Sequence, residues 1–348
     1  MDENVADRSK SSKKGDEKPT GHVKHEPPVL GTITENGVTR PKIGLALGSG
    51  VARGWAHIGI VRRLQQSGIP IDVVAGTSIG AVVGGAMVSG GLDALEEWAL
   101  GIGEYNFFRW LDFKWGRGGL FGGGQLNNLM DTKFGDYAIE DLPVPFTAIA
   151  TDLKTGHEIW LNKGDLADSI QASFALPGVF QPQQIGNRWL VDGALVNPVP
   201  VSVCRSAGCE MVIAVNLSED LYGRSRASRR KGKSTGEYGV FADIIRSPSV
   251  VGRKSAGAVF RQLFEHKDNA PSLFANMVAS LNVIQNRLAR SRMAGDPPDV
   301  TITPRVGHIG LMEFHRAAEL IEEGRIAYDE TEQLLQDALD GITYRINS

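Results

Sequence analysis

Several features that would assign a protein to a class are scarce in this sequence. Only two of its 348 residues are cysteines, Cys204 and Cys209, and their separation does not match a C-x-x-C pair or a set of four metal ligands. We therefore expect two ordinary buried thiols and a reducing, cytoplasmic setting. No group of histidine, cysteine and acidic residues has metal-ligand spacing, so we expect no metal and no other cofactor.

Charge and hydropathy argue against two further classes. The 37 Lys and Arg residues nearly balance 40 Asp and Glu residues, so bulk charge indicates no nucleic-acid partner. The longest uncharged run, residues 73–92, could span a membrane by length alone, but it opens with the strand-like VVAG and contains repeated glycines. We interpret it as a buried strand, a turn and a helix. The N-terminal residues, MDENVADRSKSSKKGDEKPTG, are charged throughout, and we expect no secretory signal there.

What the sequence does contain is a repeated alternation of strands and helices. Residues 43–48 (IGLALG) and 71–76 (IDVVAG) have the pattern of short buried strands, each followed by a glycine-containing turn and apolar residues at helical spacing. This alternation predicts an α/β fold with a parallel sheet and helices on both faces. Further strands are predicted at 145–152, 157–162, 188–193, 211–218 and 299–304, and helices within 274–295 and 312–340.

The composition also predicts the domain organisation. Residues 1–40 mix charged residues, serine and proline with almost no aromatic residues, which predicts a disordered tail. Residues 41–348 are long enough to bury a large core and are expected to form a single domain. The basic stretch at about 221–239 is predicted to be an exposed loop of this domain, because strands flank it on both sides.

A serine between glycines is the first candidate for chemistry. Residues 76–80 read Gly76-Thr77-Ser78-Ile79-Gly80, a G-x-S-x-G pattern between a predicted strand and a predicted helix. In a nucleophile elbow the small neighbours allow a strained turn that exposes the serine hydroxyl, and the helix N-terminus stabilises negative charge. The alternative is a small polar residue in a tight turn. The flanking strand and helix favour a nucleophile.

The second candidate is the glycine-rich stretch LGSGVARG at residues 47–54, again between a strand and a helix. It is open to three interpretations: a tight turn, a dinucleotide-binding loop with Asp72 as the ribose-binding acid, or an oxyanion hole. Asp72 begins its strand rather than ending it, and Gly54 comes one residue late for G-x-G-x-x-G. An oxyanion hole would use the backbone N–H groups near Gly50 and Val51.

One cation lies in the same stretch. Arg53 could hold the loop, meet an anionic head group, or be an ordinary surface arginine.

The third candidate is Asp192-Gly193, at the end of the apolar strand predicted at 188–193. An aspartate there can cap the next turn. However, parallel-sheet proteins collect their chemistry at the carboxyl ends of strands, where both Ser78 and Asp192 are expected. A partly buried Asp192 beside Ser78 could accept the proton of the serine directly.

Together, GSGVARG, GTSIG and DGA, in this order and spacing, resemble the patatin-like phospholipases, and most closely the bacterial subgroup related to neuropathy target esterase. The resemblance runs from about residue 42 to 340. It includes ATDLKTG (150–156), ASFALPGVF (172–180), DGALVNPVPV (192–201) and GLMEFHRAAELIEEG (310–324).

This resemblance implies a three-layer α/β fold and a Ser-Asp dyad without histidine. Ser78 would be the nucleophile and Asp192 the base, with the N–H groups of Gly50 and Val51 as the oxyanion hole. Supporting motif positions would be Gly48, Arg53, Gly54, Gly76, Gly80 and Gly193. In two places the loop departs from the family pattern. Ser49 replaces a glycine of the plant patatins, and Val51 replaces another glycine, although a β-branched residue tolerates positive φ poorly.

Other residues leave alternatives to this dyad and its surroundings. Ser78, Asp192 and His308 would reproduce the chain order of a serine-acid-histidine triad, whereas the DGA motif supplies a base without histidine; His57 is expected on a helix face. Residues 105–121 interleave aromatics and cations and fit a core-facing helix or a lipid contact. Residues 224–233 fit a solvated loop or a contact with anionic head groups. The stretch ASFALPGVF fits an apolar wall for an acyl chain or plain core packing.

From these elements we predict a serine lipid acyl hydrolase of the phospholipase A, lysophospholipase or esterase type. Its substrates would be phospholipids, lysophospholipids or other acyl esters, and it would be cytoplasmic, with peripheral contact at the inner face of the membrane. The alternatives are a catalytically silent lipid-binding or regulatory member of the same fold, and a nucleotide-binding α/β protein.

Overall fold

The computed structural model describes residues 32–35, 38–103, 119–121, 137–218 and 273–348. Most of the expected tail, the aromatic segment up to residue 118 and the basic loop lie outside these residues. The elements in chain order are β1 (Thr32–Glu35), β2 (Val38–Pro41), β3 (Ile43–Leu47), η1 (Val51–Trp55), α1 (Ala56–Gln66), β4 (Val73–Thr77), α2 (Ile79–Ser89), α3 (Leu92–Leu100), β5 (Gly119–Phe121), η3 (Ile139–Asp141), β6 (Phe146–Asp152), β7 (Glu158–Leu161), α6 (Leu166–Phe174), β8 (Gly178–Phe180), β9 (Gln183–Ile185), β10 (Arg188–Asp192), η4 (Gly193–Leu195), α7 (Val201–Ser206), β11 (Met211–Val215), α11 (Leu273–Gly295), β12 (Val300–Ile302), η5 (Phe314–Arg316) and α12 (Ala317–Asn347).

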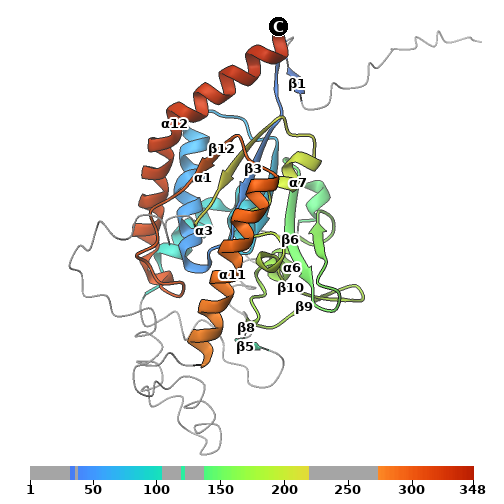
Figure 1. Ribbon diagram of the computed structural model, residues 1–348, viewed down its shortest axis with the longest axis vertical. Coiled ribbons are helices and arrows are strands. Elements are labelled where there is room, and N and C mark those ends of the chain that lie inside the picture. Colours follow the sequence, from blue (N-terminus) through green and yellow to red (C-terminus); the bar gives the residue numbers. More distant parts are fainter. Residues whose placement is uncertain (1–31, 36–37, 104–118, 122–136, 219–272) are drawn as a thin grey trace, which may run out of the picture. The chain divides into compact units, whose positions relative to one another are not determined.

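A mixed, mostly parallel sheet forms the centre of the fold (Figure 1). Hydrogen-bonded pairs link its strands along the path β12-β11-β3-β4-β6-β10-β9, and β7 also pairs with β6. The strands from β12 to β6 are parallel, whereas β7, β10 and β9 join in antiparallel pairs. The α/β fold with a mostly parallel sheet is confirmed. The strands predicted from the sequence are present, with slightly different ends.

Alternating side chains divide the core into two layers, one on each face of the sheet. In β3, Ile43, Leu45 and Leu47 belong to one apolar cluster and Ala46 to the other, because successive residues of a strand point to opposite faces. Helices α1, α2, α3, α6 and α12 supply the first cluster, and α7 and the second half of α11 supply the other. The result is the expected three-layer arrangement of helix, sheet and helix.

The long uncharged run is a strand followed by a helix. Residues 73–77 form β4, Ser78 makes the turn, and α2 begins at Ile79. Both elements are buried, which explains their continuous apolar character. Among the described helices, none combines the length and apolarity needed to cross a bilayer.

The expected boundary between tail and domain is corrected at one point. Residues 32–35 and 38–41 form an antiparallel hairpin, so order begins before residue 41. The hairpin is tied to the sheet because Arg40 donates two hydrogen bonds to the Asp72 carboxylate, at 2.7 and 2.9 Å. The sequence signal was available, since runs of β-branched residues lie on both sides of Asn-Gly, a dipeptide preferred in two-residue hairpin loops.

Cys204 and Cys209 are buried thiols, as predicted. Burial raises the pKa of the Cys209 thiol to about 11, which leaves it uncharged at neutral pH. Within the described ranges, no group of three or more His, Cys, Asp or Glu residues is arranged to hold a metal ion.

Candidate active site

Ser78 occupies a strained turn between β4 and α2. Its φ of 58° is rare for a residue other than glycine, and such strain costs about 1–3 kcal/mol. Gly80 permits the turn, because a β-carbon there would lie 2.2 Å from the carbonyl oxygen of Leu47. A β-carbon at Gly76 would likewise lie 2.5 Å from the carbonyl oxygen of Gly80. The backbone N–H of Ser78 donates to the hydroxyl of Ser173 at 2.9 Å. These contacts hold the conformation of a nucleophile elbow.

The register of the sheet brings Asp192 to this turn. In β6, Ile149 pairs with Thr77 of β4, and the next residue, Ala150, pairs with Asp192 of β10. Because β7 pairs with residues 148–151 from the other side, β4 and β10 share one edge of β6 and end facing each other. We expected both residues at the carboxyl ends of parallel strands. This argument was wrong for Asp192, whose strand is antiparallel to β6; the pairing register brings the two side chains together instead.

Ser78 and Asp192 are joined directly by a hydrogen bond. The Ser78 hydroxyl donates to Oδ2 of Asp192 at 2.7 Å, and both residues are almost completely buried. The other carboxylate oxygen, Oδ1, accepts from the N–H of Ala194 at 2.8 Å, in the turn that Gly193 begins. Thr151 donates its hydroxyl to the carbonyl oxygen of Asp192 at 2.8 Å. The carboxylate is therefore held in one orientation with one oxygen directed at the serine.

Burial sets the basicity of this carboxylate. It raises the pKa of Asp192 to about 7, against the opposing effect of the hydrogen bonds from Ala194 and Ser78. A carboxylate with a pKa close to neutral accepts a proton far more readily than one exposed to water. The electrostatic setting of Asp192 thus suits a general base that works near neutral pH.

The glycine loop, defined here as residues 48–53, passes close to this pair. Four of its six N–H groups are already bonded: Gly48 to Val215 O at 3.1 Å, Ser49 to Pro198 O at 2.8 Å, Ala52 to Leu311 O at 3.1 Å and Arg53 to Gly50 O at 3.2 Å. For the N–H groups of Gly50 and Val51, no partner is found among the described residues. A backbone donor in a protein interior almost always has a partner, so two neighbouring donors without one are exceptional. Such donors are available to an anion.

Val51 adopts a positive φ although its side chain is β-branched. Its φ is 51°, and its side chain is buried in the core. The turn then passes into η1, where Gly54 lies against Ile79 of the elbow, so closely that a β-carbon would come within 2.1 Å of its side chain. The residue that follows the loop, Gly54, is consequently packed against the residue that follows Ser78, Ile79.

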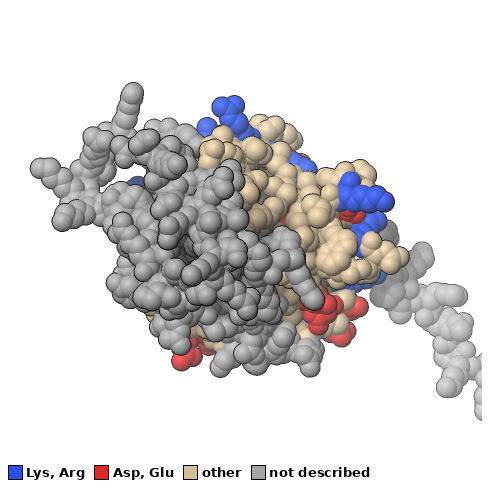
Figure 2. Space-filling model, turned by 90° about the horizontal axis from the view of Figure 1, so that it is seen from below, with Lys and Arg blue, Asp and Glu red and all other residues tan. Residues whose placement is uncertain are grey.

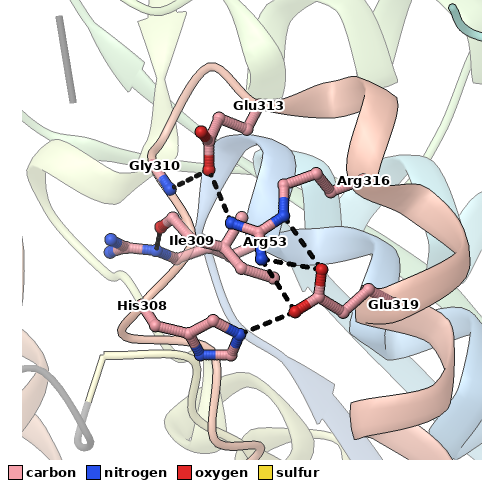
Figure 3. Close-up of polar contacts among 7 residues, drawn as sticks. All are labelled: Arg53, His308, Ile309, Gly310, Glu313, Arg316 and Glu319. Atoms are coloured by element: carbon pink, nitrogen blue, oxygen red, sulfur yellow. Dashed lines mark hydrogen bonds and ion pairs between the residues drawn. The ribbon is translucent and has the colours of Figure 1, made fainter. Parts of the chain in front are cut away.

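Arg53 is neither a surface residue nor exposed to a head group. It is 2% exposed, and its Nε donates to the carbonyl oxygen of Ile309 at 2.7 Å, across 256 residues of chain (Figure 3). Of the three interpretations, the structure supports the one in which Arg53 holds the loop. Sequence reasoning missed its partner, because nothing in the local pattern indicates a carbonyl so far along the chain.

The two histidines considered as bases are bonded elsewhere. His57 is fully buried, and its Nε2 lies 2.7 Å from the carbonyl oxygen of Gly48, so this nitrogen carries the proton and donates it. Burial lowers the pKa of His57 to about 4, so the ring is neutral. His308 is exposed and bonds Glu319 at 2.8 Å. Neither ring is bonded to Ser78 or Asp192. His57 instead supports the glycine loop.

The residue required for dinucleotide binding lies at the opposite edge of the sheet. The Asp72 carboxylate binds Arg40 and the N–H of Ile43, the first residue of β3, whereas the glycine loop follows the last residue of β3. Asp72 therefore cannot reach a ribose bound at the loop.

The stretch 172–180 contacts the backbone of both Ser78 and Asp192. Ser173 accepts the hydrogen bond from the N–H of Ser78, and the carbonyl oxygen of Ala175 accepts the N–H of Asp192 at 3.0 Å. One segment thus fixes the backbone of both residues. The only sequence signal was a polar residue inside an apolar run.

Comparison with known proteins gives consistent matches. The family model for patatin-like phospholipase matches residues 45–205. An uncharacterized NTE family protein of Mycobacterium tuberculosis is 31% identical, over 86% of this chain and 93% of that protein. Neuropathy target esterase sws of Drosophila melanogaster is 34% identical, over 52% of this chain and 13% of its own length. Among solved structures, VipD from Legionella pneumophila has a TM-score of 0.42 and 13% identity, covering 88% of this chain and 69% of VipD.

Proposed function

Because the chain belongs to the patatin-like phospholipase family, we propose that it is a serine hydrolase that cleaves acyl esters of phospholipids or lysophospholipids. Membership supports a lipid hydrolase in general. The finer proposal assigns the chemistry to a dyad of Ser78 and Asp192, with the N–H groups of Gly50 and Val51 as the oxyanion hole.

The observation that carries the proposal is the 2.7 Å hydrogen bond from the Ser78 hydroxyl to Oδ2 of Asp192. As Oγ attacks the ester carbonyl, its proton passes to this oxygen. The negative charge that develops on the carbonyl oxygen is stabilised by the N–H groups of Gly50 and Val51, which have no partner among the described residues. Collapse of the intermediate breaks the ester bond, and Asp192 returns the proton to the departing alkoxide.

The same groups complete the cycle in reverse. A water molecule gives its proton to Asp192 and attacks the acyl-serine, again with the charge on the loop. The fatty acid leaves as Ser78 regains a proton from Asp192. A pKa of about 7 for Asp192 supports both directions, because the carboxyl group can accept and return a proton near neutral pH.

We further propose that the protein approaches its substrate at a lipid surface. Leu153 and Trp189 are 56% and 53% exposed, and the N–H of Leu153 bonds the carbonyl oxygen of Trp189, so the two are neighbours. They lie past the end of β6, at the edge of the sheet that carries Ser78, beside the exposed Lys154 and Arg188. Tryptophan with lysine or arginine is typical of contact with lipid head groups.

Figure 2 shows one face of the molecule, on which the surface of the described residues is mostly uncharged and the charged side chains lie towards the margins. Sedimentation with vesicles of anionic phospholipid tests the contact in an inactive Ser78→Ala background. Trp189→Ala should reduce binding, and Tyr344→Ala, which removes another exposed aromatic side chain on α12, should not. Equal binding by both variants would remove this surface from the proposal.

Activity is tested with a fluorophosphonate probe and a fluorogenic acyl ester, with chelator present. The wild-type protein should be labelled and should turn over the ester, and Ser78→Ala should do neither. A wild-type protein that is not labelled would favour a catalytically silent member of the family, for which the strained Val51 is the observation in favour. Labelling that survives in Ser78→Ala would exclude Ser78 as the nucleophile.

A further inference from the structure

The glycine loop is supported by a segment near the C-terminus. The carbonyl oxygens of Ile309 and Leu311 accept hydrogen bonds from Nε of Arg53 and the N–H of Ala52, at 2.7 and 3.1 Å. These two loop residues directly follow Gly50 and Val51, whose N–H groups are unpaired among the described residues. We call residues 308–319 the C-terminal clamp; they lie outside the residues that the family model matches.

A network of charged side chains shapes the clamp (Figure 3). Glu313 accepts the N–H of Gly310 at 2.8 Å and Nη1 of Arg316 at 2.9 Å. Arg316 also binds Glu319 through two nitrogens, at 2.7 and 2.9 Å, and Glu319 holds His308 at 2.8 Å. The two carbonyl groups that meet the loop therefore lie in a segment that Arg316 and its two carboxylate partners tie to α12.

Apolar contacts anchor the clamp to the helix that follows the loop. The rings of Trp55 and Phe314 meet edge to face, with centroids 6.0 Å apart. Helices α1 and α12 cross closely, because a β-carbon at Gly59 or at Gly324 would lie 2.0 Å from a carbonyl oxygen of the other helix. The clamp is therefore packed against η1 through Phe314, and the α12 helix that follows it is packed against α1.

This support is needed because the loop is strained. Val51 has a positive φ, a conformation that a β-branched residue keeps only when its surroundings enforce it. The bonds to Ala52 and Arg53 fix the backbone immediately after Val51, and the bond from His57 fixes Gly48 before it. If the clamp were lost, we expect the loop to relax and the N–H groups of Gly50 and Val51 to turn away from the reacting carbonyl.

We propose that the C-terminal clamp is a positioning element of the oxyanion hole, with Arg316 as its central residue. The inference rests on the proposed function, since it assigns the loop a role in the same reaction. Arg316 touches neither Ser78 nor Asp192 and acts through the carbonyl groups of Ile309 and Leu311.

The first test replaces Arg316 with methionine. Misplacing oxyanion donors by a fraction of an ångström lowers kcat steeply, so Arg316→Met should reduce kcat by about 10- to 100-fold with little change in KM. The control is Arg305→Met, which removes an exposed ion pair between the segment that precedes the clamp and α12, that of Arg305 with Glu330. Exposed ion pairs contribute little to stability, so Arg305→Met should unfold at the wild-type temperature. Arg316 is partly buried with Glu313, so the kcat values are compared below the unfolding temperature of the less stable variant.

The second test addresses the hydrogen bond from Arg53 to the carbonyl oxygen of Ile309. Arg53→Gln retains an N–H donor near the position of Nε, whereas Arg53→Met removes it at similar length. We expect Arg53→Gln to keep more of the kcat than Arg53→Met. Equal losses in the two variants would show that the bond to Ile309 does not position the loop.

Hydrogen–deuterium exchange provides a readout independent of activity. Peptides covering residues 48–55 should exchange faster in Arg316→Met than in the wild type, and no faster in Arg305→Met. Unchanged exchange together with unchanged kcat would overturn the clamp. If the wild type hydrolyses no ester, the proposed function fails, whereas the exchange comparison still tests whether the clamp orders the loop.

Discussion

The elbow and the glycine loop both contain a strained backbone conformation, but different contacts hold it in each. Each holds a residue other than glycine at positive φ, 58° for Ser78 and 51° for Val51. The elbow is fixed by segments within residues 45–205: the register of β6, the close approach of Gly80 to Leu47 and the hydroxyl of Ser173. The loop depends on distant segments, above all on Ile309 and Leu311.

This difference has a functional consequence. The supports of the elbow lie within residues 45–205, which the family model matches, and the clamp lies outside them. Strain at a site persists only while the structure around it enforces it. Variants can therefore damage the proposed nucleophile and the proposed oxyanion hole separately and test each one.

Removal of the proposed nucleophile should have the largest effect. Ser78→Ala is expected to abolish fluorophosphonate labelling and to lower ester turnover by about four orders of magnitude or more. The glycine loop should keep its exchange protection, because its supports come from other segments. A loop that loses protection in Ser78→Ala would show that the two regions are not independent.

Loss of the proposed base should have the next largest effect. Asp192→Asn removes the proton acceptor, so turnover should fall by about 10²- to 10⁴-fold. In the wild type, the rate should rise with pH through the pKa of Asp192, about 7, because only the carboxylate accepts a proton. The residual activity of the variant should lack this rise, and pH–rate profiles provide the measurement.

A smaller effect is expected where His57 supports the loop. His57→Leu removes the donor to Gly48 and should lower kcat by about tenfold, whereas His57→Gln offers another N–H donor and should retain more activity. The rise in rate near pH 7 should remain in both variants, since the pKa of His57 is about 4. If the rise disappears with His57, the titrating group is not Asp192.

The smallest expected effects concern the pH dependence of stability, which has opposite directions for Asp192 and His57. The pKa of Asp192 is raised by burial, so its contribution to stability falls as pH rises from about 4 to about 7. The pKa of His57 is lowered by burial, so its contribution falls as pH drops from about 6.5 to about 4. Relative to the wild type, Asp192→Asn should gain Tm more near pH 8 than near pH 5, and His57→Gln the reverse. Calorimetric scans at the two pH values measure the Tm difference between each variant and the wild type. If this difference changed in the same direction with pH for both variants, the prediction would be wrong.

The sequence predicted some elements well because their patterns are local. The strand before Ser78, the glycine-limited turn and the helix after it all lie within residues 73–89, and the structure has them there. The hairpin at 32–41 carried an equally local signal and was missed, because a tail rich in charge and proline dominated the composition. No local pattern indicated Ser173 as the partner of the Ser78 N–H.

By itself, then, the sequence determined which groups could do chemistry: a serine in a turn that requires glycine, an aspartate at the end of an apolar strand, and a loop of closely spaced backbone donors. Only the tertiary structure decided how they meet. β10 runs antiparallel, yet its register on β6 ends it at Ser78, and the loop keeps two N–H groups unpaired among the described residues. Hydrogen bonds across the sheet and across 256 residues set these relations. They arise from packing, which a local pattern of residues does not encode.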